Sequence, residues 1–118
     1  MFLVWIAIIM EQDIMVFVKI HKGSDKEAVI AACDADILGE TFSDDEKGLC
    51  LRISESFYGG NLVSIEKAVE MIQNATNVNL VGKNIVRETV EAGLASPEAI
   101  ITIGKKGREV PHLLILRL

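Results

Sequence analysis

The sequence predicts a single α+β domain in which a mixed β-sheet of about six or seven strands packs with two main helices. Short apolar runs rich in β-branched residues recur along the chain and are bounded by turn residues. Two other segments carry apolar residues at helical spacing. The 118 residues, half of them hydrophobic, suffice for one buried core.

The first half of the chain consists of predicted strands joined by turns. Residues 15–21 and 28–33 are apolar runs of strand length, and residues 22–27 between them predict a turn. Residues 43–46 are acidic and predict a loop. Apolar and polar residues alternate in residues 49–53, which is typical of a strand with one buried face.

Two helices are predicted in the second half. The first begins after Ser64, a residue type that caps helix N-termini. Its apolar residues fall at positions i, i+3, i+4 and i+7, which gives one buried face: Ile65, Ala68, Val69 and Ile72. The second helix begins after Gly82 and runs to about residue 92, where Gly93 is a typical C-terminal glycine.

Strands account for the rest of the second half. Between the two helices, Val78, Leu80 and Val81 predict a short buried strand. Residues 100–103 and 112–118 predict the last two strands, with a loop at 104–107. Pro111 marks the start of the final strand or an edge position, because proline lacks a backbone N–H.

Residues 1–14 form an N-terminal apolar extension, and residues 15–118 form the domain. The first ten residues are all apolar. They are too short to span a bilayer as a helix and lack the features of a signal peptide. They predict a strand docked in the sheet or a homodimer contact. The alternative is that Met15 is the natural start.

Charge and cysteine content narrow the function classes. The formal net charge is −5, which argues weakly against a nucleic-acid binder, although a local basic patch matters more than the total. There are two cysteines without a paired motif, so a disulfide scaffold is not expected. No cofactor and no metal site are expected.

Three segments predict a ligand-binding site, if the fold brings them together. Each contains residues that packing alone explains poorly. The glycines allow close approach of the backbone, the aromatic rings offer a stacking face, and the histidine titrates near neutrality. The candidate residues are Phe57, Tyr58, Gly59, Gly60, Asn79, Gly82, Pro111 and His112. The alternative is three separate turns.

Basic residues predict a second kind of contact, with phosphate or RNA. Gly82 lies where a strand meets a helix, and this geometry suits a simple anion site. The residues around Gly82 lack the full phosphate-loop motif. The residues that could form a basic patch are Lys83, Arg87, Lys105, Lys106 and Arg108. The alternative is that the basic residues near the C-terminus form a solvated hairpin tip.

Cys33, Asp34 and His112 are the candidates for catalysis. A cysteine beside a histidine could form a thiolate nucleophile, and two histidines with Cys33 could bind a metal. Neither possibility has a local spacing motif, and a free cysteine is usually a small buried hydrophobic residue. We therefore expect Cys33 to be structural.

The chain from Met15 to Leu118 resembles a family of small archaeal proteins of unknown function. The resemblance depends on short motifs in a fixed order: Lys19-Ile20-His21, Ala32-Cys33-Asp34, Leu38-Gly39-Glu40-Thr41-Phe42, Phe57-Tyr58-Gly59-Gly60, Asn79-Leu80-Val81-Gly82 and Val110-Pro111-His112. Residues 1–14 fall outside it, and the loop at residues 105–108 is longer than is usual there. The resemblance implies an archaeal, cytoplasmic protein and carries no reaction.

The function expected from the sequence is a non-enzymatic binding module associated with translation or RNA, with RNA or a ribosome-associated protein as its partner and no membrane contact. One alternative is a small enzyme that uses Cys33, Asp34 and His112. The other is a structural subunit of a larger assembly. A basic face would favour RNA, a closed pocket around Cys33 and His112 would favour catalysis, and a large apolar patch would favour assembly.

Overall fold

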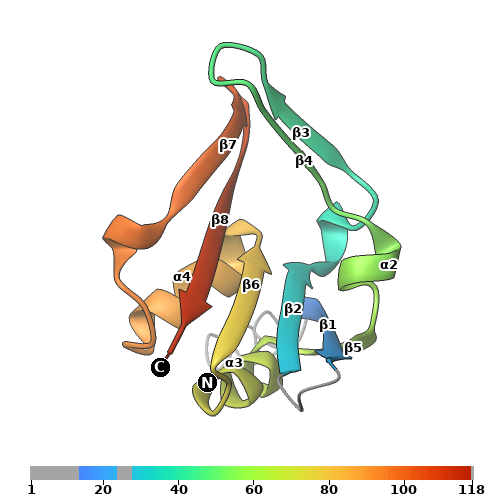
Figure 1. The fold of residues 1–118 in the computed structure, drawn as a ribbon, viewed down its shortest axis with the longest axis vertical. Coiled ribbons are helices and arrows are strands. Elements are labelled where there is room, and N and C mark those ends of the chain that lie inside the picture. The colour runs from blue at the N-terminus through green and yellow to red at the C-terminus, as the bar shows by residue number, and fades with distance from the viewer. Residues whose placement is uncertain (1–13, 24–27, 118) are drawn as a thin grey trace, which may run out of the picture.

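The computed structural model describes residues 14–23 and 28–117 (Figure 1). The expectations for residues 1–13 therefore lie outside the described residues. The helices and strands, in chain order, are β1 (Met15–Lys22), β2 (Ala28–Asp34), the 3-10 turn η1 (Ala35–Ile37), β3 (Thr41–Asp44), β4 (Leu49–Arg52), α2 (Glu55–Tyr58), β5 (Asn61–Ser64), α3 (Ile65–Gln73), β6 (Asn77–Val81), α4 (Lys83–Glu91), the 3-10 turn η2 (Pro97–Ala99), β7 (Ile101–Lys105) and β8 (Arg108–Leu116).

The main sheet has six strands in the order β5-β1-β2-β6-β8-β7, and β3 pairs with β4 in a separate two-stranded sheet. The pairing of β2 with β6 is parallel and the other pairings are antiparallel, so the main sheet is mixed. The described part is thus a single compact α+β unit. The predicted fold class, a mixed sheet of about six or seven strands with two main helices, is confirmed.

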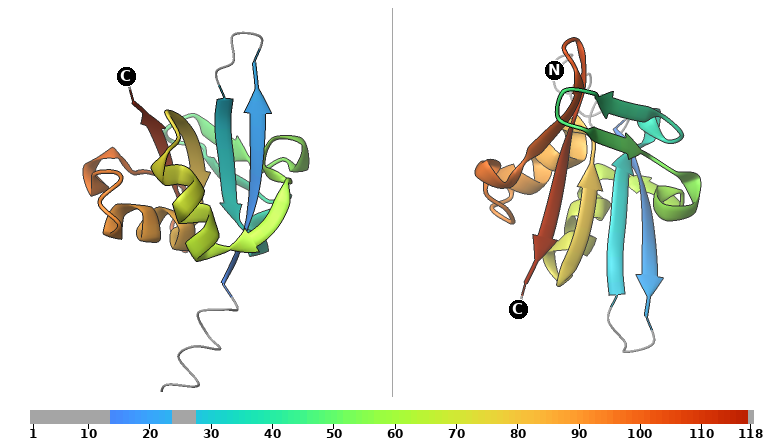
Figure 2. Two further views of the ribbon diagram at one scale, coloured as in Figure 1. Left: turned by 90° about the horizontal axis from the view of Figure 1, so that it is seen from below. Right: turned by 45° about the horizontal axis from the view of Figure 1, so that its top comes forward.

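Both main helices cover the same face of the sheet (Figure 2). The strand pairings make β5, β6 and β7 parallel to one another, so α3 and α4 each lie within a crossover connection between parallel strands. Such connections are right-handed, and both run in the same direction across the sheet, which puts both helices on one face. Apolar side chains of the two helices pack there against alternate residues of β1, β2, β6 and β8.

The other face of the sheet is covered only in part, by α2 and the β3–β4 hairpin. A second buried cluster forms there from Ala31, Cys33, Phe42, Ile53, Tyr58, Val81, Ile103 and Val110. In Figure 1 the hairpin leans over one end of the sheet, and its tip lies beside the tip of the β7–β8 hairpin. Part of this face therefore stays open to solvent.

Local signals in the sequence set several helix boundaries. The side chain of Ser64 accepts a hydrogen bond from the backbone N–H of Lys67, which caps α3. Gly93 has φ 76° and follows α4, a left-handed conformation that favours glycine at helix ends. These caps were predicted from residue type because they depend only on neighbours in the chain.

Three expectations about secondary structure were wrong. The acidic segment 43–46 is not wholly a loop, because β3 extends to Asp44 and pairs with β4. Residues 57–60, for which a turn was the alternative, instead end the short helix α2 at Tyr58 and lead into the edge strand β5, which was not predicted. Strand β8 begins at Arg108 and passes through Pro111. The carbonyl of Pro111 accepts from the backbone N–H of Gly82, which lies beyond the end of β6. The nitrogen of Pro111 points to the same side, past the end of the β6–β8 ladder, so its missing N–H removes no hydrogen bond from that ladder.

Candidate functional site

A row of three polar side chains crosses the face of the sheet opposite α3 and α4. The Tyr58 hydroxyl donates to Oδ1 of Asn79 at 2.7 Å, and Nε2 of His112 lies 2.9 Å from the same oxygen. Tyr58 comes from α2, Asn79 from β6 and His112 from β8. We call these three residues the polar row. The structure thus brings together one residue from each of the three segments that the sequence selected.

The backbone around α2 explains how Tyr58 reaches the sheet. Ser54 caps the helix by accepting from the backbone N–H of Phe57. Gly59 and Gly60 then pass so close to other backbone that neither position has room for a side chain. A Cβ on Gly60 would overlap the Val18 carbonyl oxygen, and one on Gly59 would lie 2.5 Å from that of Glu55. These glycines are therefore explained by packing.

The geometry of the row defines which atoms carry protons. Because Oδ1 of Asn79 accepts from Tyr58, Nε2 of His112 contacts an acceptor and carries the proton itself. Burial lowers the pKa of His112 below its ordinary value of 6.5, which favours the neutral imidazole at neutral pH. Burial also raises the pKa of Tyr58 to about 12, so its hydroxyl stays protonated.

Two polar atoms of the row remain free for a ligand. Nδ2 of Asn79 is a donor and Nδ1 of His112 is an acceptor, and neither is paired with a described residue. No buried side-chain nitrogen or oxygen among the described residues lacks a partner, so both atoms reach solvent. A donor and an acceptor on one face can pair with the N–H and C=O of one residue in an extended segment, or with the edge of a base.

Exposed apolar side chains lie next to the polar row. Leu114 and Leu116 follow His112 at alternate positions of β8 and so share its face, with exposed fractions of 58% and 70%. Ile101 is paired with His112 across the β7–β8 ladder and is 52% exposed. We call these three residues with the polar row the open sheet surface. Its apolar part is unusually exposed for such large side chains.

The aromatic pair predicted from the sequence is arranged differently from the expectation. Tyr58 is only 2% exposed, so its ring is part of the core and offers no stacking face. The ring of Phe57 is half-buried and stacks on His21, with centroids 4.7 Å apart and planes 18° from parallel. Nε2 of His21 also lies 2.8 Å from the Phe57 carbonyl oxygen. The rings hold α2 against β1.

Gly82 and Pro111 do not belong to the open sheet surface. Gly82 has φ 123° and lies against the carboxylate of Asp34. That carboxylate accepts from the backbone N–H groups of Asn84 and Ile85, each at 2.9 Å. The N-terminus of α4, which the sequence suggested as an anion site, is therefore occupied by a side chain of the protein itself.

Cys33 and Asp34 are both committed to the interior. Cys33 has no exposed surface, and burial raises the pKa of its thiol to about 12, with a further contribution from the Asp34 carboxylate. Burial also raises the pKa of Asp34, while its two backbone hydrogen bonds act in the opposite direction. A thiol with such a pKa is protonated at neutral pH and is a poor nucleophile. Cys33 is therefore not an activated nucleophile in this structure.

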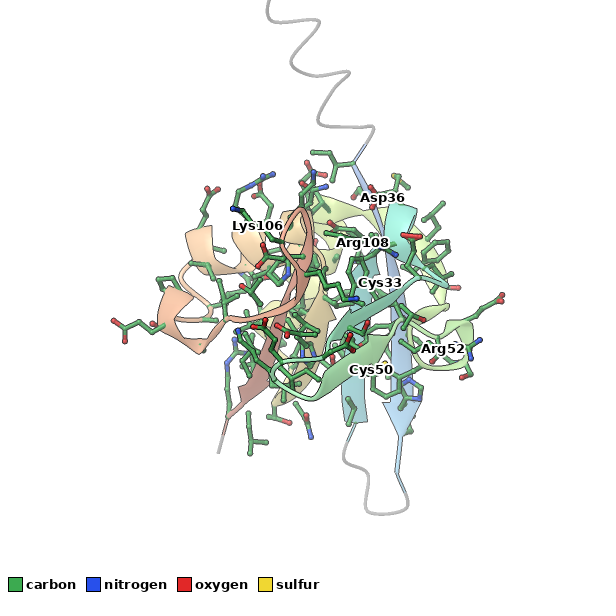
Figure 3. The ribbon with its side chains drawn as sticks, turned by 90° about the horizontal axis from the view of Figure 1, so that it is seen from above. Cys33, Asp36, Cys50, Arg52, Lys106 and Arg108 are labelled. Atoms are coloured by element: carbon green, nitrogen blue, oxygen red, sulfur yellow. The ribbon has the colours of Figure 1, made fainter. Side chains whose placement is uncertain are left out.

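The predicted basic residues fall into two groups. Lys83 and Arg87 lie one turn apart on α4. Lys105, Lys106 and Arg108 lie at the tip of the β7–β8 hairpin, where Figure 3 labels the last two. There Lys105 is 3.4 Å from the Asp45 carboxylate, and Arg108 is 3.6 Å from that of Glu40 and stacks on Phe42. Two of the five therefore already face carboxylates in the β3–β4 hairpin or just before it.

Sequence reasoning missed the apolar part of the open sheet surface and the role of His21. In the sequence, Leu114, Leu116 and Ile101 are ordinary strand residues. An apolar strand does not reveal from its sequence which of its two faces stays uncovered in the fold. His21 itself is one signal in the sequence, because a histidine is unusual in a largely apolar strand. It lies on the same face of β1 as Phe17 and Lys19.

Two further features of the described part bear on its chemistry. Within residues 14–23 and 28–117, no group of three or more His, Cys, Asp or Glu side chains is arranged to hold a metal ion. No helix in the same part of the chain is long and apolar enough to cross a membrane.

The fold and the site define an α+β protein with a mixed six-stranded sheet, covered by two helices on one face and carrying a half-open polar row on the other. The chain belongs to the family described as protein of unknown function (DUF424), which matches residues 21–118. It is similar to an uncharacterized conserved protein from Methanopyrus kandleri, whose crystal structure gives a TM-score of 0.69 at 32% identity, over 88% of this chain and 94% of that one. No curated protein matches. The resemblance seen in the motifs is confirmed.

Proposed function

We propose that this protein is a non-enzymatic binding module that holds a segment of a partner protein on the open sheet surface. The observation that carries the proposal is the polar row, whose free donor on Asn79 and free acceptor on His112 lie beside exposed leucines. The backbone N–H and C=O of one extended residue of the partner would pair with the two free atoms, and apolar side chains would cover Leu114 and Leu116.

The contacts of the candidate catalytic residues argue against the enzyme alternative. Cys33 is buried with a thiol pKa raised to about 12, and Asp34 is occupied with capping α4. An activated nucleophile needs a depressed pKa or an adjacent base. Binding is thus the better account of the same region.

RNA association is the second candidate. It is favoured by Lys83 and Lys106, which are exposed and make no ion pair with a described residue. Against it, Lys105 and Arg108 face carboxylates, and the open sheet surface carries no exposed aromatic ring for stacking bases. An archaeal origin, which the Methanopyrus neighbour supports, and a cytoplasmic location, which the resemblance in the motifs implies, remain part of the proposal.

Affinity purification from the native cells tests this function. The bait proteins are the natural chain, Leu114→Lys, and the control Ile20→Lys, each with and without ribonuclease treatment. Ile20 is 48% exposed but lies on the opposite face of the sheet, so it controls for the loss of an exposed apolar residue. Bound proteins are identified by mass spectrometry and bound RNA by sequencing.

A protein partner retained by the natural chain and by Ile20→Lys, lost with Leu114→Lys and insensitive to ribonuclease is the expected result. Capture that depends on RNA would support the second candidate instead. Equal capture by all three baits would show that the open sheet surface is not the binding site.

A further inference from the structure

A groove on the helix side of the sheet is lined by aliphatic side chains. Its volume is about 310 Å³. The apolar lining comes from α4 and from residues flanking or within the last two strands: Val86, Val90, Ile100 and Pro111. Val86 is almost wholly buried and forms the floor, whereas the other three are half-buried and form the walls. The groove therefore presents apolar surface that other described residues leave uncovered.

Two basic side chains border this groove. Lys83 and Arg87 lie four residues apart on α4, so they project from the same side of the helix. Lys83 makes no ion pair with a described residue. Arg87 lies 3.9 Å from the carboxylate of Glu88, and both side chains are well exposed. Exposed ion pairs of this kind contribute only about 0–1 kcal/mol, so both cations are available to a partner.

The charge along the groove changes from one end to the other. Glu91, one further turn along α4, also borders it. The end at Lys83 and Arg87 is therefore positive and the end at Glu91 is negative. A ligand that complements the groove carries its carboxylates near the start of α4 and its apolar side chains over the valines.

From this combination we propose that the groove binds an acidic, aliphatic segment of a partner protein. Its leucine-like side chains enter between Val90 and Ile100, and its Asp or Glu side chains pair with Lys83 and Arg87. The site is separate from the open sheet surface, because Pro111 and His112 are neighbours on β8 and side chains alternate between the two faces. It therefore stands independently of the proposed function.

RNA fits the same groove less well. A nucleic acid is held by cations along its backbone together with aromatic rings or polar groups for its bases. This groove offers two cations, one opposing carboxylate and an aliphatic lining without an aromatic ring. The lining matches aliphatic side chains, and the cations match carboxylates next to them in the same segment.

Titration of the ¹⁵N-labelled full chain with defined probes tests the proposal. The first probe is a blocked nine-residue peptide in which leucines alternate with glutamates. The matched probes replace its glutamates by glutamine or its leucines by alanine, and a fourth probe is oligouridylate. Lys83→Glu with Arg87→Glu removes the positive rim, and Val90→Thr changes the polarity of the lining at nearly constant shape. Lys67→Glu, an exposed position on α3, is the charge control.

The acidic leucine peptide is expected to shift amide signals of α4 and Ile100, and to bind about tenfold more weakly after the double charge reversal and in high salt. Val90→Thr weakens binding as well, whereas Lys67→Glu leaves it unchanged. Equal binding of the glutamine or alanine peptide, or no shifts at the groove, would overturn the proposal. Shifts there with oligouridylate alone would assign the groove to RNA.

Discussion

The hydroxyl of Tyr58 and the amide oxygen of Asn79 are joined by a 2.7 Å hydrogen bond between residues 21 positions apart in the chain. Tyr58 is buried, so the bond satisfies a hydroxyl that would otherwise be desolvated without a partner. It also ties α2 to the centre of the sheet and orients Asn79 toward His112. The polar row is thus part of the stability of the fold as well as a candidate surface.

A double-mutant cycle measures this bond. Tyr58→Phe is expected to lower the free energy of unfolding by about 1 kcal/mol, and Asn79→Ala by about 1–3 kcal/mol because it leaves the Tyr58 hydroxyl unpaired. The double variant should lose less than the sum of the two. Urea denaturation gives the three values, and strict additivity would contradict a direct bond.

Protonation of His112 should destabilise the folded chain. Its folded pKa is lowered by burial below the ordinary 6.5, so between these two pKa values the unfolded chain binds more protons. The free energy of unfolding therefore rises with pH through this window and levels off above 6.5. The contribution of His112 is lost as the pH falls through its folded pKa.

The measurement for His112 is the urea midpoint across the acidic to neutral range, together with the NMR titration of its ring. His112→Gln keeps a donor near Oδ1 of Asn79 but cannot titrate, so it should flatten this part of the pH dependence. An unchanged pH profile in His112→Gln, or a ring pKa above 6.5, would be inconsistent with the neutral imidazole.

Gly82 should tolerate no side chain while Asp34 is present. A Cβ there would lie 2.5 Å from the Asp34 carboxyl carbon, at φ 123°. Gly82→Ala is expected to cost about 2–4 kcal/mol from backbone strain and overlap together. Gly93→Ala is the matched control, because φ there is 76° and nothing lies within 4 Å, so strain alone should cost about 1 kcal/mol.

Asp34→Ala combined with Gly82→Ala separates the overlap from the strain. The double variant should lose less stability than the sum of the two single variants. The reason is that Asp34→Ala removes the carboxylate that the added methyl group at position 82 would meet. Calorimetric melting of the natural chain, the three variants of this pair and Gly93→Ala gives the result. Equal losses for Gly82→Ala and Gly93→Ala would mean that the contact with Asp34 is unimportant.

Cys33 should be inert in the folded protein. Its thiol is buried and its pKa is raised to about 12, whereas Cys50 is exposed. Iodoacetamide at neutral pH is expected to modify Cys50 alone until the chain unfolds, as followed by mass spectrometry. Cys33→Ser should cost about 1–3 kcal/mol through a poorly paired buried hydroxyl, and the control Cys50→Ser about 0.5 kcal/mol or less. Rapid modification of Cys33 would refute this assignment.

The elements that the sequence predicted well are those decided by near neighbours in the chain. Helices α3 and α4 carry apolar residues at helical spacing, and their ends depend on Ser64 and Gly93. Alternation or apolar runs of strand length marked β1, β2, β4 and β6. Strand β5 was missed because Asn61–Ser64 shows no alternation, and helix α2 because one helical turn carries too little periodicity; both are stabilised by pairing with β1 or packing on it.

The sequence by itself also selected three segments with residues that local packing explains poorly. Only the tertiary structure decided that Tyr58, Asn79 and His112 meet, while Gly82 and Pro111 do not join them. The reason is physical, because adjacent side chains of a strand point to opposite faces of the sheet. Pro111 and His112 therefore lie on opposite faces although they are neighbours in the chain. Which face stays open depends on where α2, α3, α4 and the β3–β4 hairpin pack. That is a property of contacts between residues far apart in the chain.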